Sequence, residues 1–327
     1  MAEKLKLTVA LDRYDRHFPF FDGTVPVPDD IELDVKQVGQ SVHLKDGSDR
    51  HGRMLHNEAY DICEFSMSSF LMAKQRNMPI SGIPVFPRRL FSQSQMWVSP
   101  ESGLWHPRDL IGKKVALSSF QTTLSLLAKG DLKFHYDVPW EDIHWILTTK
   151  EKVDFTVKNG VKIDFIGNRQ SLGMMLEKGE IDAFFLPHPP VSVMRGETPA
   201  RRLFQDCQHE EKTYYERYGD FPIMHIIAIR QSLLEKEPWL AREIMKMFDH
   251  AREITASYYE DPNWSCMAWG RHYFEQERAF FPNDPWENGY KRNFNNIERF
   301  IRYSHDQAMI DTPYSPELLF APDTIDT

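Results

Sequence analysis

The chain has few cysteines, no long apolar run and no excess of positive charge, and each absence excludes a class of protein. Its three cysteines, Cys63, Cys207 and Cys266, lie far apart among 327 residues, which fits neither a disulfide framework nor the ligand spacing of a zinc site. Mean hydropathy is -0.51, and no stretch is apolar enough to predict a membrane-spanning helix. The net charge of -9 makes nucleic acid and anionic membranes unexpected partners.

The fingerprints of several enzyme classes are also missing. Neither GxGxxG nor GxxxxGK[ST] occurs, so nothing indicates a dinucleotide or P-loop site. A GxSxG elbow and an HExxH pair are absent as well. His51 and His56 are five residues apart, which does not place both rings on one helix face, so we predict no metal and no other cofactor. The N-terminal segment MAEKLKLTVAL has no signal-peptide core, which predicts a cytoplasmic location.

What the sequence does contain is a pattern of strands alternating with helices. Lys4–Leu11 and Ile31–Val38 alternate as strands do, and Trp239–Tyr259 has the apolar spacing of one helix face. Such units predict an α/β fold with mostly parallel sheets. The polar segment Tyr214–Asp220 is interpreted as the crossing that returns from a second unit.

We therefore predict two lobes joined by two chain crossings, which together form a hinge. Residues 1–96 with 222–327 are assigned to lobe I, and residues 97–221 to lobe II. A cleft between two α/β lobes is a usual place for a small-molecule site.

Polar side chains follow the first predicted strand in the segment DRYDRH. Arg13, Tyr14, Asp15 and Arg16 are side chains that bind anions and hydroxyls, and loops at the carboxyl ends of strands face the ligand in open α/β sheets. The alternative is a solvated charged loop.

Two predicted strand-to-helix junctions carry hydroxyl groups where a helix begins. Helix N-termini bind carboxylates well, so two junctions facing one cleft suit a carboxylate or dicarboxylate, although each serine can equally be a plain cap. The candidate residues are Glu64, Ser66 and Ser68 at the first junction and Ser118, Gln121 and Thr122 at the second.

Three further basic residues are candidates. In FPRRLF one arginine can form a bidentate clamp while its neighbour lies on the surface, and we select Arg89. His188 ends a predicted strand in FFLPHPP between prolines that fix its backbone, which suits either a turn or a chemical role. His225 lies among apolar residues in PIMHIIAI, and is either buried and hydrogen-bonded or directed into the cleft.

The sequence resembles the 4,5-dihydroxyphthalate decarboxylase family at these segments. The resemblance runs from YDR and the following Asp22-Gly23 through DICEFSMSSF, IPVFPRRLF, the turn 121–123, GEIDAFFLP and DFPIMH to the tail YSPELLFAPDTID. It implies a two-lobed fold like that of type 2 periplasmic binding proteins. It also implies a cofactor-independent decarboxylase that protonates the ring carbon of a hydroxylated aromatic acid and releases CO2.

This resemblance implies a small-molecule aromatic carboxylate as the ligand, and we leave a homo-oligomer open. The roles assigned on this basis are proton donor for His188 or His225, acceptor from the ring hydroxyl for Glu64 or Asp15, and anion clamp for Arg16 and Arg89.

Two positions depart from the family pattern. Ser92-Gln93-Ser94 replaces an expected Arg-His-Ser run, which makes Gln93 a substrate-binding candidate, and His188 replaces an expected arginine. Loss of basic groups there predicts a substrate with fewer carboxylates, or a non-catalytic binding protein or sensor for an aromatic carboxylate.

Overall fold

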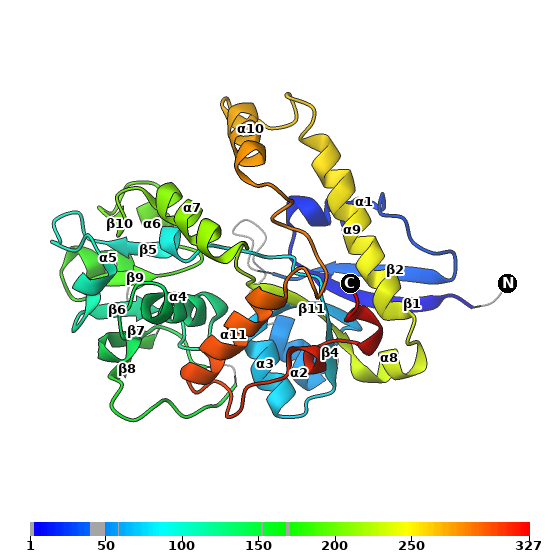
Figure 1. The fold of residues 1–327 in the computed structure, drawn as a ribbon, viewed down its shortest axis with the longest axis horizontal. Helices are drawn as coiled ribbons and strands as arrows, with labels where there is room; N and C mark the ends of the chain where they lie inside the picture. The colour runs from blue at the N-terminus through cyan, green and yellow to red at the C-terminus, as the bar shows by residue number, and fades with distance from the viewer. Residues whose placement is uncertain (1–2, 40–49, 58, 152, 168–170) are drawn as a thin grey trace.

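The chain folds around two β-sheets, one in each lobe. The structure, a computed structural model, describes residues 3–39, 50–57, 59–151, 153–167 and 171–327. Among these residues one sheet has five strands and the other has six. Figure 1 shows the first sheet in the right-hand lobe and the second in the left-hand lobe. The predicted two-lobed α/β arrangement is therefore confirmed.

The first sheet places a fully buried strand at its centre. In spatial order its strands are β2 (Ile31–Gln37), β1 (Leu5–Leu11), β3 (Ile62–Ser66), β11 (His225–Arg230) and β4 (Ile80–Ile83). β1 is parallel to β2 and β3, whereas β11 is antiparallel to β3 and β4. All five residues of β3 are buried, so any polar side chain on it needs a partner inside the protein.

The second sheet repeats the pattern of a parallel core with antiparallel additions. Its order is β10 (Arg201–Arg202), β5 (Met96–Val98), β9 (Ala183–Phe185), β6 (Lys114–Leu117), β7 (His144–Leu147) and β8 (Ile163–Phe165). β6 is parallel to β7 and β9, and β5 is antiparallel to β9. In both sheets the strand that follows a crossing between the sheets, β5 or β11, therefore runs antiparallel.

The chain passes to the second sheet between Ile83 and Met96 and returns between Arg202 and His225. The boundaries 96/97 and 221/222 remain a prediction. The segment 214–220, expected to be the return crossing, lies within this stretch, and most of it belongs to helix α7 (Cys207–Tyr218). Asp206 caps this helix by accepting the His209 N–H at 3.0 Å, and Gly219 ends it with a left-handed φ of 72°.

Helices cover the sheets and also join the lobes. α3 (Met67–Gln75), α4 (Thr123–Phe134) and α11 (Phe294–Asp306) contact one another between the two sheets, where Figure 1 shows them in the lower half. The ring of Tyr303 lies directly against Gly130, where a Cβ atom would overlap it. The remaining helices are α1 (Phe18–Asp22), α2 (Arg50–Asn57), α5 (Leu172–Glu177), α6 (Val191–Met194), α8 (Gln231–Lys236), α9 (Leu240–Tyr258) and α10 (Gly270–Phe280).

One hydrophobic core is shared by both lobes. It includes Phe65 and Phe70 on the side of the first sheet, Leu126 and Trp145 on the side of the second, and Phe300 of α11. A second cluster lies between the first sheet and α9, and a third lies on the other face of the second sheet. The lobes are thus fastened together on the side of α3, α4 and α11.

Candidate functional site

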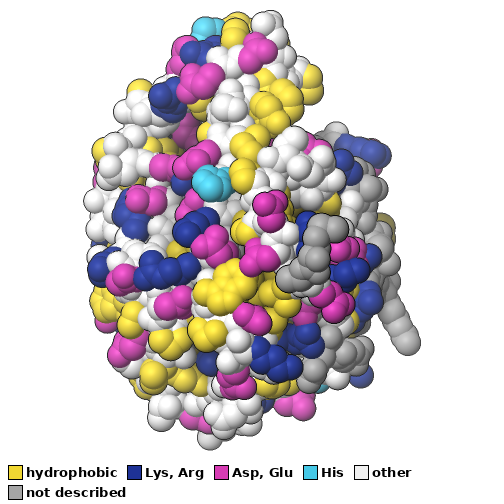
Figure 2. All heavy atoms as spheres, turned by 90° about the vertical axis from the view of Figure 1, so that its right-hand side faces the viewer, with side chains coloured by type: hydrophobic (Ala, Val, Ile, Leu, Met, Phe, Trp, Pro, Cys, Tyr) yellow, Lys and Arg dark blue, Asp and Glu magenta, His cyan; other side chains and the backbone are white. Residues whose placement is uncertain are grey.

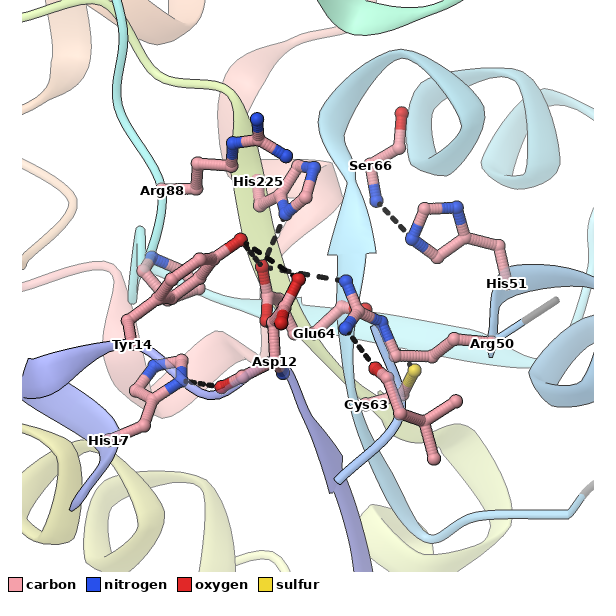
Figure 3. A network of polar contacts seen from close by, with 12 residues as sticks. Asp12, Tyr14, His17, Arg50, His51, Cys63, Glu64, Ser66, Arg88 and His225 are labelled. Atoms are coloured by element: carbon pink, nitrogen blue, oxygen red, sulfur yellow. Dashed lines mark hydrogen bonds and ion pairs between the residues drawn. The ribbon is translucent and has the colours of Figure 1, made fainter. Parts of the chain in front are cut away.

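Polar side chains gather at the edge of the first sheet where β1 and β3 end and β11 begins. Parallel strands bring their carboxyl ends to one edge, and the antiparallel β11 adds its first residue there. His225 and Ser66 are register partners across β11 and β3. Figure 3 shows side chains from these strands, from the loop after β1, from α2 and from the first crossing meeting at this edge, which we call the polar edge.

Glu64, in the middle of β3, is the centre of the network and has no exposed surface. Its Oε2 accepts the Asp12 N–H at 2.9 Å, and its Oε1 accepts the Tyr14 hydroxyl at 3.3 Å. Nη2 of Arg50 lies 3.5 Å from Oε1, and Nδ1 of His225 donates to the same oxygen. Burial alone would raise the pKa of Glu64, but Arg50 and His225 outweigh it and hold this pKa well below its usual range. Glu64 is therefore a fixed, ionised carboxylate.

This carboxylate fixes His225 in one tautomer. Because an ionised Glu64 only accepts, Nδ1 of His225 carries the shared proton, and Nε2 is the position where the ring can take up or deliver another. Burial lowers the pKa of His225 to about 4, against the opposite effect of Glu64. His225 is therefore neutral at pH 7, and an anion placed beside it would raise its pKa.

The loop after β1 extends the network. The Tyr14 hydroxyl lies 3.4 Å from Oδ2 of Asp12 as well as near Glu64, and burial together with Glu64 raises the pKa of Tyr14 well above its ordinary value. Nδ1 of His17 donates to the Asp12 carbonyl oxygen at 2.8 Å. Residue 39 has to be glycine, because a Cβ atom there would overlap the Asp12 carboxylate. Tyr14 is thus held as a neutral hydroxyl donor.

α2 contributes a second imidazole. The Ser66 N–H donates to Nε2 of His51 at 3.2 Å, so the neutral His51 ring carries its proton on Nδ1. The rings of His51 and His225 are perpendicular, with centroids 6.0 Å apart. In Figure 3 the second nitrogen of His225 points toward the guanidinium of Arg88, whereas that of His51 lies on the far side of its ring. Both imidazoles therefore have a defined tautomer, and that of His225 lies beside Arg88.

The two neighbouring arginines have different surroundings. Nη2 of Arg88 lies 3.3 Å from Nε2 of His188, which follows β9 in the other lobe, so His188 does face the polar edge. Arg89, our predicted clamp, is buried, and burial lowers its pKa to about 9. Its guanidinium is committed to three protein oxygens, those of Phe221 at 2.8 Å, Glu287 at 3.0 Å and Asn293 at 2.7 Å. Arg88 therefore occupies the position that the sequence analysis gave to Arg89.

Three hydroxyls join the lobes where α3 and α4 begin. Oγ of Ser66 lies 2.7 Å and Oγ of Ser68 lies 3.2 Å from Oγ1 of Thr123. Ser68 also donates to the Gln121 carbonyl oxygen at 2.5 Å. Both helices direct their positive N-terminal ends to this cluster, and two like ends repel each other unless an anion lies between them. The predicted facing of the two junctions is thus present, but through Thr123, which the sequence analysis had not selected.

The other candidates of the second junction form hydrogen bonds with other residues of lobe II. The Gln121 amide binds both backbone groups of Val153, at 3.0 and 3.2 Å. The Thr122 hydroxyl lies 2.5 Å from Oγ of Ser125. Ser118 accepts backbone N–H groups through its carbonyl oxygen. The structure gives these side chains structural roles.

Three further candidates lie away from the Glu64 network. Arg13 is exposed, with its guanidinium 5.6 Å from the ring of Phe18. Asp15 accepts the hydroxyl of Tyr259, on the side of α9, at 2.7 Å. Gln93 is fully buried in the first crossing, just before β5. The acceptor role of Asp15 and the ligand contacts of Arg13 and Gln93 remain predictions.

Arg16 is enclosed between two aromatic rings. Its guanidinium lies 4.2 Å from the ring of Tyr14 and 4.2 Å from that of Trp286. Its Nε donates to the Pro87 carbonyl oxygen at 2.5 Å, immediately before Arg88. Arg16 therefore contacts Tyr14 and the first crossing, and its role as an anion clamp remains a prediction.

Several residues of the network were missed from the sequence. Asp12 follows the first strand directly, and Arg88 was weighed against Arg89, so both carried a signal. Arg50 and His51 lie in a polar segment whose sequence drew attention only through the spacing of His51 and His56, which does not suit a metal site. The missed residues are Asp12, His17, Arg50, His51, Arg88 and Thr123.

In the described part of the chain, no three His, Cys, Asp or Glu side chains gather as metal ligands would. No helix among the described residues is long and apolar enough to cross a membrane. The absence of a cofactor and the cytoplasmic location remain predictions.

The fold and the position of the polar edge define a class, the two-lobed folds of periplasmic binding proteins. The structure is similar to the periplasmic aliphatic sulphonate binding protein SsuA of Escherichia coli, with a TM-score of 0.56 and 11% identity, covering 100% of both chains. It is also similar to the desulfurization enzyme DSZB, with a TM-score of 0.53 and 11% identity over 98% of this chain and 97% of that one. The predicted fold is confirmed, and a fold shared by binding proteins and enzymes leaves the activity open.

Sequence comparison leads to a narrower group. No protein-family model matches the chain. It is 28% identical over 333 residues to a 4,5-dihydroxyphthalate decarboxylase of Comamonas testosteroni, covering 99% of this chain and 98% of the relative. A 4,5-dihydroxyphthalate decarboxylase of Pseudomonas putida is 26% identical over 222 residues, covering 66% of this chain and 83% of the relative. The resemblance to these decarboxylases, predicted from separate motifs, is confirmed along the whole chain.

Proposed function

We propose that the protein is a decarboxylase of a hydroxylated aromatic carboxylic acid of the 4,5-dihydroxyphthalate type, acting without a metal or organic cofactor. The name of the full-length relative supports this substrate class. The observation that carries the proposal is the buried Glu64–His225 pair at the polar edge, next to Arg88. A paired, buried acid–base group with a displaced pKa is the kind of feature that marks an active site.

The reaction defines what the site has to supply. In 4,5-dihydroxyphthalate each hydroxyl lies opposite one carboxylate and donates electrons toward the carbon that bears it. A proton adds to this carbon, the bond to the carboxylate breaks, and its electrons return to the ring as CO2 leaves. One proton is consumed and one C–H bond replaces the carboxylate. The protein must deliver that proton, hold the remaining carboxylate and exclude water.

His225 is the proton donor in this proposal. It acts through Nε2, while Glu64 orients the ring through Nδ1 and stabilises the imidazolium. The ligand-free ring is neutral because burial lowers its pKa to about 4. An anionic substrate in the same buried place raises that pKa, so binding draws in the proton that the reaction uses.

Arg88 and the two helix N-termini hold the spectator carboxylate. Arg88 comes from the first crossing, and Ser66, Ser68 and Thr123 come from the first turns of α3 and α4. His188 contacts Arg88 across the lobes and so positions it, instead of delivering the proton. A single guanidinium at this place favours a substrate with one spectator carboxylate.

The direct test is CO2 release and product analysis with chelator-treated protein and a panel of hydroxybenzoates and hydroxyphthalates. We expect release from at least one hydroxyphthalate, with no gain on adding divalent metals. Tight binding without release from any compound would instead establish a binding protein, the function named for the sulphonate-binding neighbour. The homo-oligomer also remains a prediction, to be checked by the solution mass.

A further inference from the structure

A cavity of about 340 Å³ lies between α7 and α10, next to both crossings and apart from the Glu64 network. Phe91 of the first crossing and Phe221 of the second form one wall, with stacked rings 4.7 Å apart. Tyr273 and Phe280 of α10 form the opposite wall. Figure 1 shows α10 standing above α7, away from the two sheets. The cavity therefore bridges the segments that join the lobes.

The walls favour a flat apolar ligand. Five aromatic residues, the four above and Phe281, line a volume at the lower end of small-molecule sites, which suits a single ring. Tyr273 is 56% exposed, and the helix that carries it has no buried residue. A ligand that covers such exposed aromatic surface binds with a favourable free energy.

The polar groups of the cavity select against a carboxylate. Glu211 is half-buried, and its Oε1 accepts both the N–H, at 3.2 Å, and the hydroxyl of Ser94. Burial raises the pKa of Glu211 to about 7. Glu277 also lines the cavity, and Lys212 is the cation among its lining residues. When they are ionised, two carboxylates against one ammonium repel an anion, and a carboxyl oxygen accepts a hydrogen bond from a neutral donor.

We propose that this cavity is a second ligand site, which binds a one-ring aromatic molecule with a hydroxyl donor and no carboxylate, and that its occupant modulates the polar edge. The ligand ring stacks between the crossings and α10, and its hydroxyl donates to Glu211. Such a ligand differs from the proposed substrate by the absence of the group that Arg88 holds.

A packed chain of side chains connects the cavity to the polar edge. Phe221 and Pro285 line the cavity, and Pro285 precedes Trp286 in the sequence. The ring of Trp286 meets that of Phe221 edge-on, with centroids 5.3 Å apart. Trp286 stacks on Arg16, and Arg16 stacks on Tyr14 of the Glu64 network. A contiguous chain of this kind can carry coupling between two sites. The modulating role rests on the proposed decarboxylase function, whereas the binding site does not.

Binding is tested with p-cresol on the full-length protein by calorimetry, with benzoate as the anionic comparison. We expect saturable binding of p-cresol, and benzoate, which can also bind at the polar edge, should displace p-cresol only at concentrations at least about tenfold higher. Tyr273→Ala should weaken p-cresol binding about tenfold, the value of one aromatic contact. Glu211→Gln should remove the rise in affinity that the wild type shows from pH 6 to pH 8, where ionised Glu211 becomes the acceptor. Glu216→Gln, at an exposed position of the same helix, should change nothing.

Lack of saturable p-cresol binding would overturn the proposal. Equal affinity in the wild type, Tyr273→Ala and Glu211→Gln would also overturn it, because p-cresol would then bind elsewhere.

Coupling is tested by the steady-state kinetics of 4,5-dihydroxyphthalate with and without p-cresol. We expect p-cresol to change KM or kcat about fivefold in the wild type, at the lower end of measured couplings, and to have no effect in Tyr273→Ala at the same concentration. Competitive inhibition that persists in Tyr273→Ala would place p-cresol at the polar edge and overturn the modulating role. If the wild type released no CO2, the proposed function would fail while the calorimetric result would still decide the site.

Discussion

The two lobes meet with unequal chemistry. Lobe I contributes the carboxylate of Glu64 and the imidazole of His225 from its rigid sheet, together with the guanidinium of Arg50 from α2. Lobe II brings a hydroxyl, a helix N-terminus and one imidazole that contacts an arginine, in Thr123 and His188. Acid–base groups thus come from one lobe and anion-binding groups from both.

The difference has a structural cause. β3 and β11 are hydrogen-bonded neighbours in the middle of a sheet, so the backbone fixes Glu64 relative to His225. The groups of lobe II lie at a helix N-terminus and in the segment after β9, without a strand ladder between them. The sheet is therefore the place that aligns a proton donor, whereas the groups of lobe II add contacts for an anion.

The largest effect is expected from breaking the acid–base pair of lobe I. His225→Gln should lower kcat about 10³-fold, within the usual range for general acid catalysis. The free protein has a His225 pKa of about 4, so kcat/KM of the wild type should fall from pH 5 to pH 8, and His225→Gln should lose this dependence. Stopped-flow or CO2-electrode rates across pH provide the measurement.

Glu64→Gln is the companion variant, since Glu64 acts through His225 and not on the substrate. It should reduce kcat about 10²-fold and abolish the uptake of a proton on ligand binding, which calorimetry in two buffers detects. Wild-type kcat in His225→Gln, with circular dichroism showing a folded protein, would rule out His225 as the donor.

The second effect concerns acid stability, in which one buried residue of each lobe should act in the opposite direction. His17 of lobe I has a pKa lowered from 6.5 to about 4, chiefly by burial, so the unfolded chain binds its proton first as the pH falls. Stability is therefore lost between pH 6.5 and pH 4, by at most about 3 kcal/mol for this residue. Urea unfolding of His17→Gln should show a flatter loss over that interval.

Asp131 of α4 provides the contrast. Burial raises its pKa to about 6, although the Ser92, Tyr214 and Tyr303 hydroxyls donate to it, so the folded state gains stability as the pH falls from 6 to 3.8. Asp131→Asn should therefore steepen the acid loss. A slope equal to that of the wild type in both variants would show that other groups govern acid stability.

The third effect separates two adjacent arginines. Arg88→Met should raise KM for the hydroxyphthalate substrate about 30-fold, the value of one charge-assisted contact. The free energy of unfolding should change little. Arg89→Met should instead lower that free energy by about 3 kcal/mol, because three buried oxygens lose their donor. Steady-state kinetics and denaturant titration of both variants decide between them, and the opposite pattern would return the clamp to Arg89.

The smallest effect compares two hydroxyls of lobe II. Thr123→Val removes the hydroxyl that meets Ser66 and should raise KM about fivefold, the value of one neutral hydrogen bond. Ser118→Ala should leave KM unchanged, because Ser118 acts through its backbone carbonyl. Equal KM values for both variants would mean that the N-terminus of α4 does not contact the substrate.

Regular segments were the easiest to predict. The expected strand Lys4–Leu11 contains β1, and the expected helix Trp239–Tyr259 contains α9. Both repeat an apolar period long enough to be read along the chain. α7 was missed because only Tyr214 and Tyr215 of its residues are buried, which leaves no apolar stripe in the sequence.

The residues of the site likewise include some that could be predicted from the sequence and some that could not. The presence of Ser66 and His225 at strand ends, and of Glu64 within the strand that Ser66 ends, could be predicted, since strands follow from the apolar pattern. The choice between Arg88 and Arg89 could not, because the crossing has no regular period from which a side-chain direction follows. The same holds for Arg50 and His51, whose helix reaches β3 only in the folded chain.

By itself the sequence determined the α/β class, the two lobes and the resemblance to decarboxylases, because apolar periodicity and local motifs are properties of neighbouring residues. Only the tertiary structure decided which charges meet. Glu64 and His225 are 161 positions apart, and Arg88 and His188 are 100 apart. Whether such groups form an acid–base pair or a clamp depends on strand order and on the direction of each side chain, which are set when the sheets and crossings assemble.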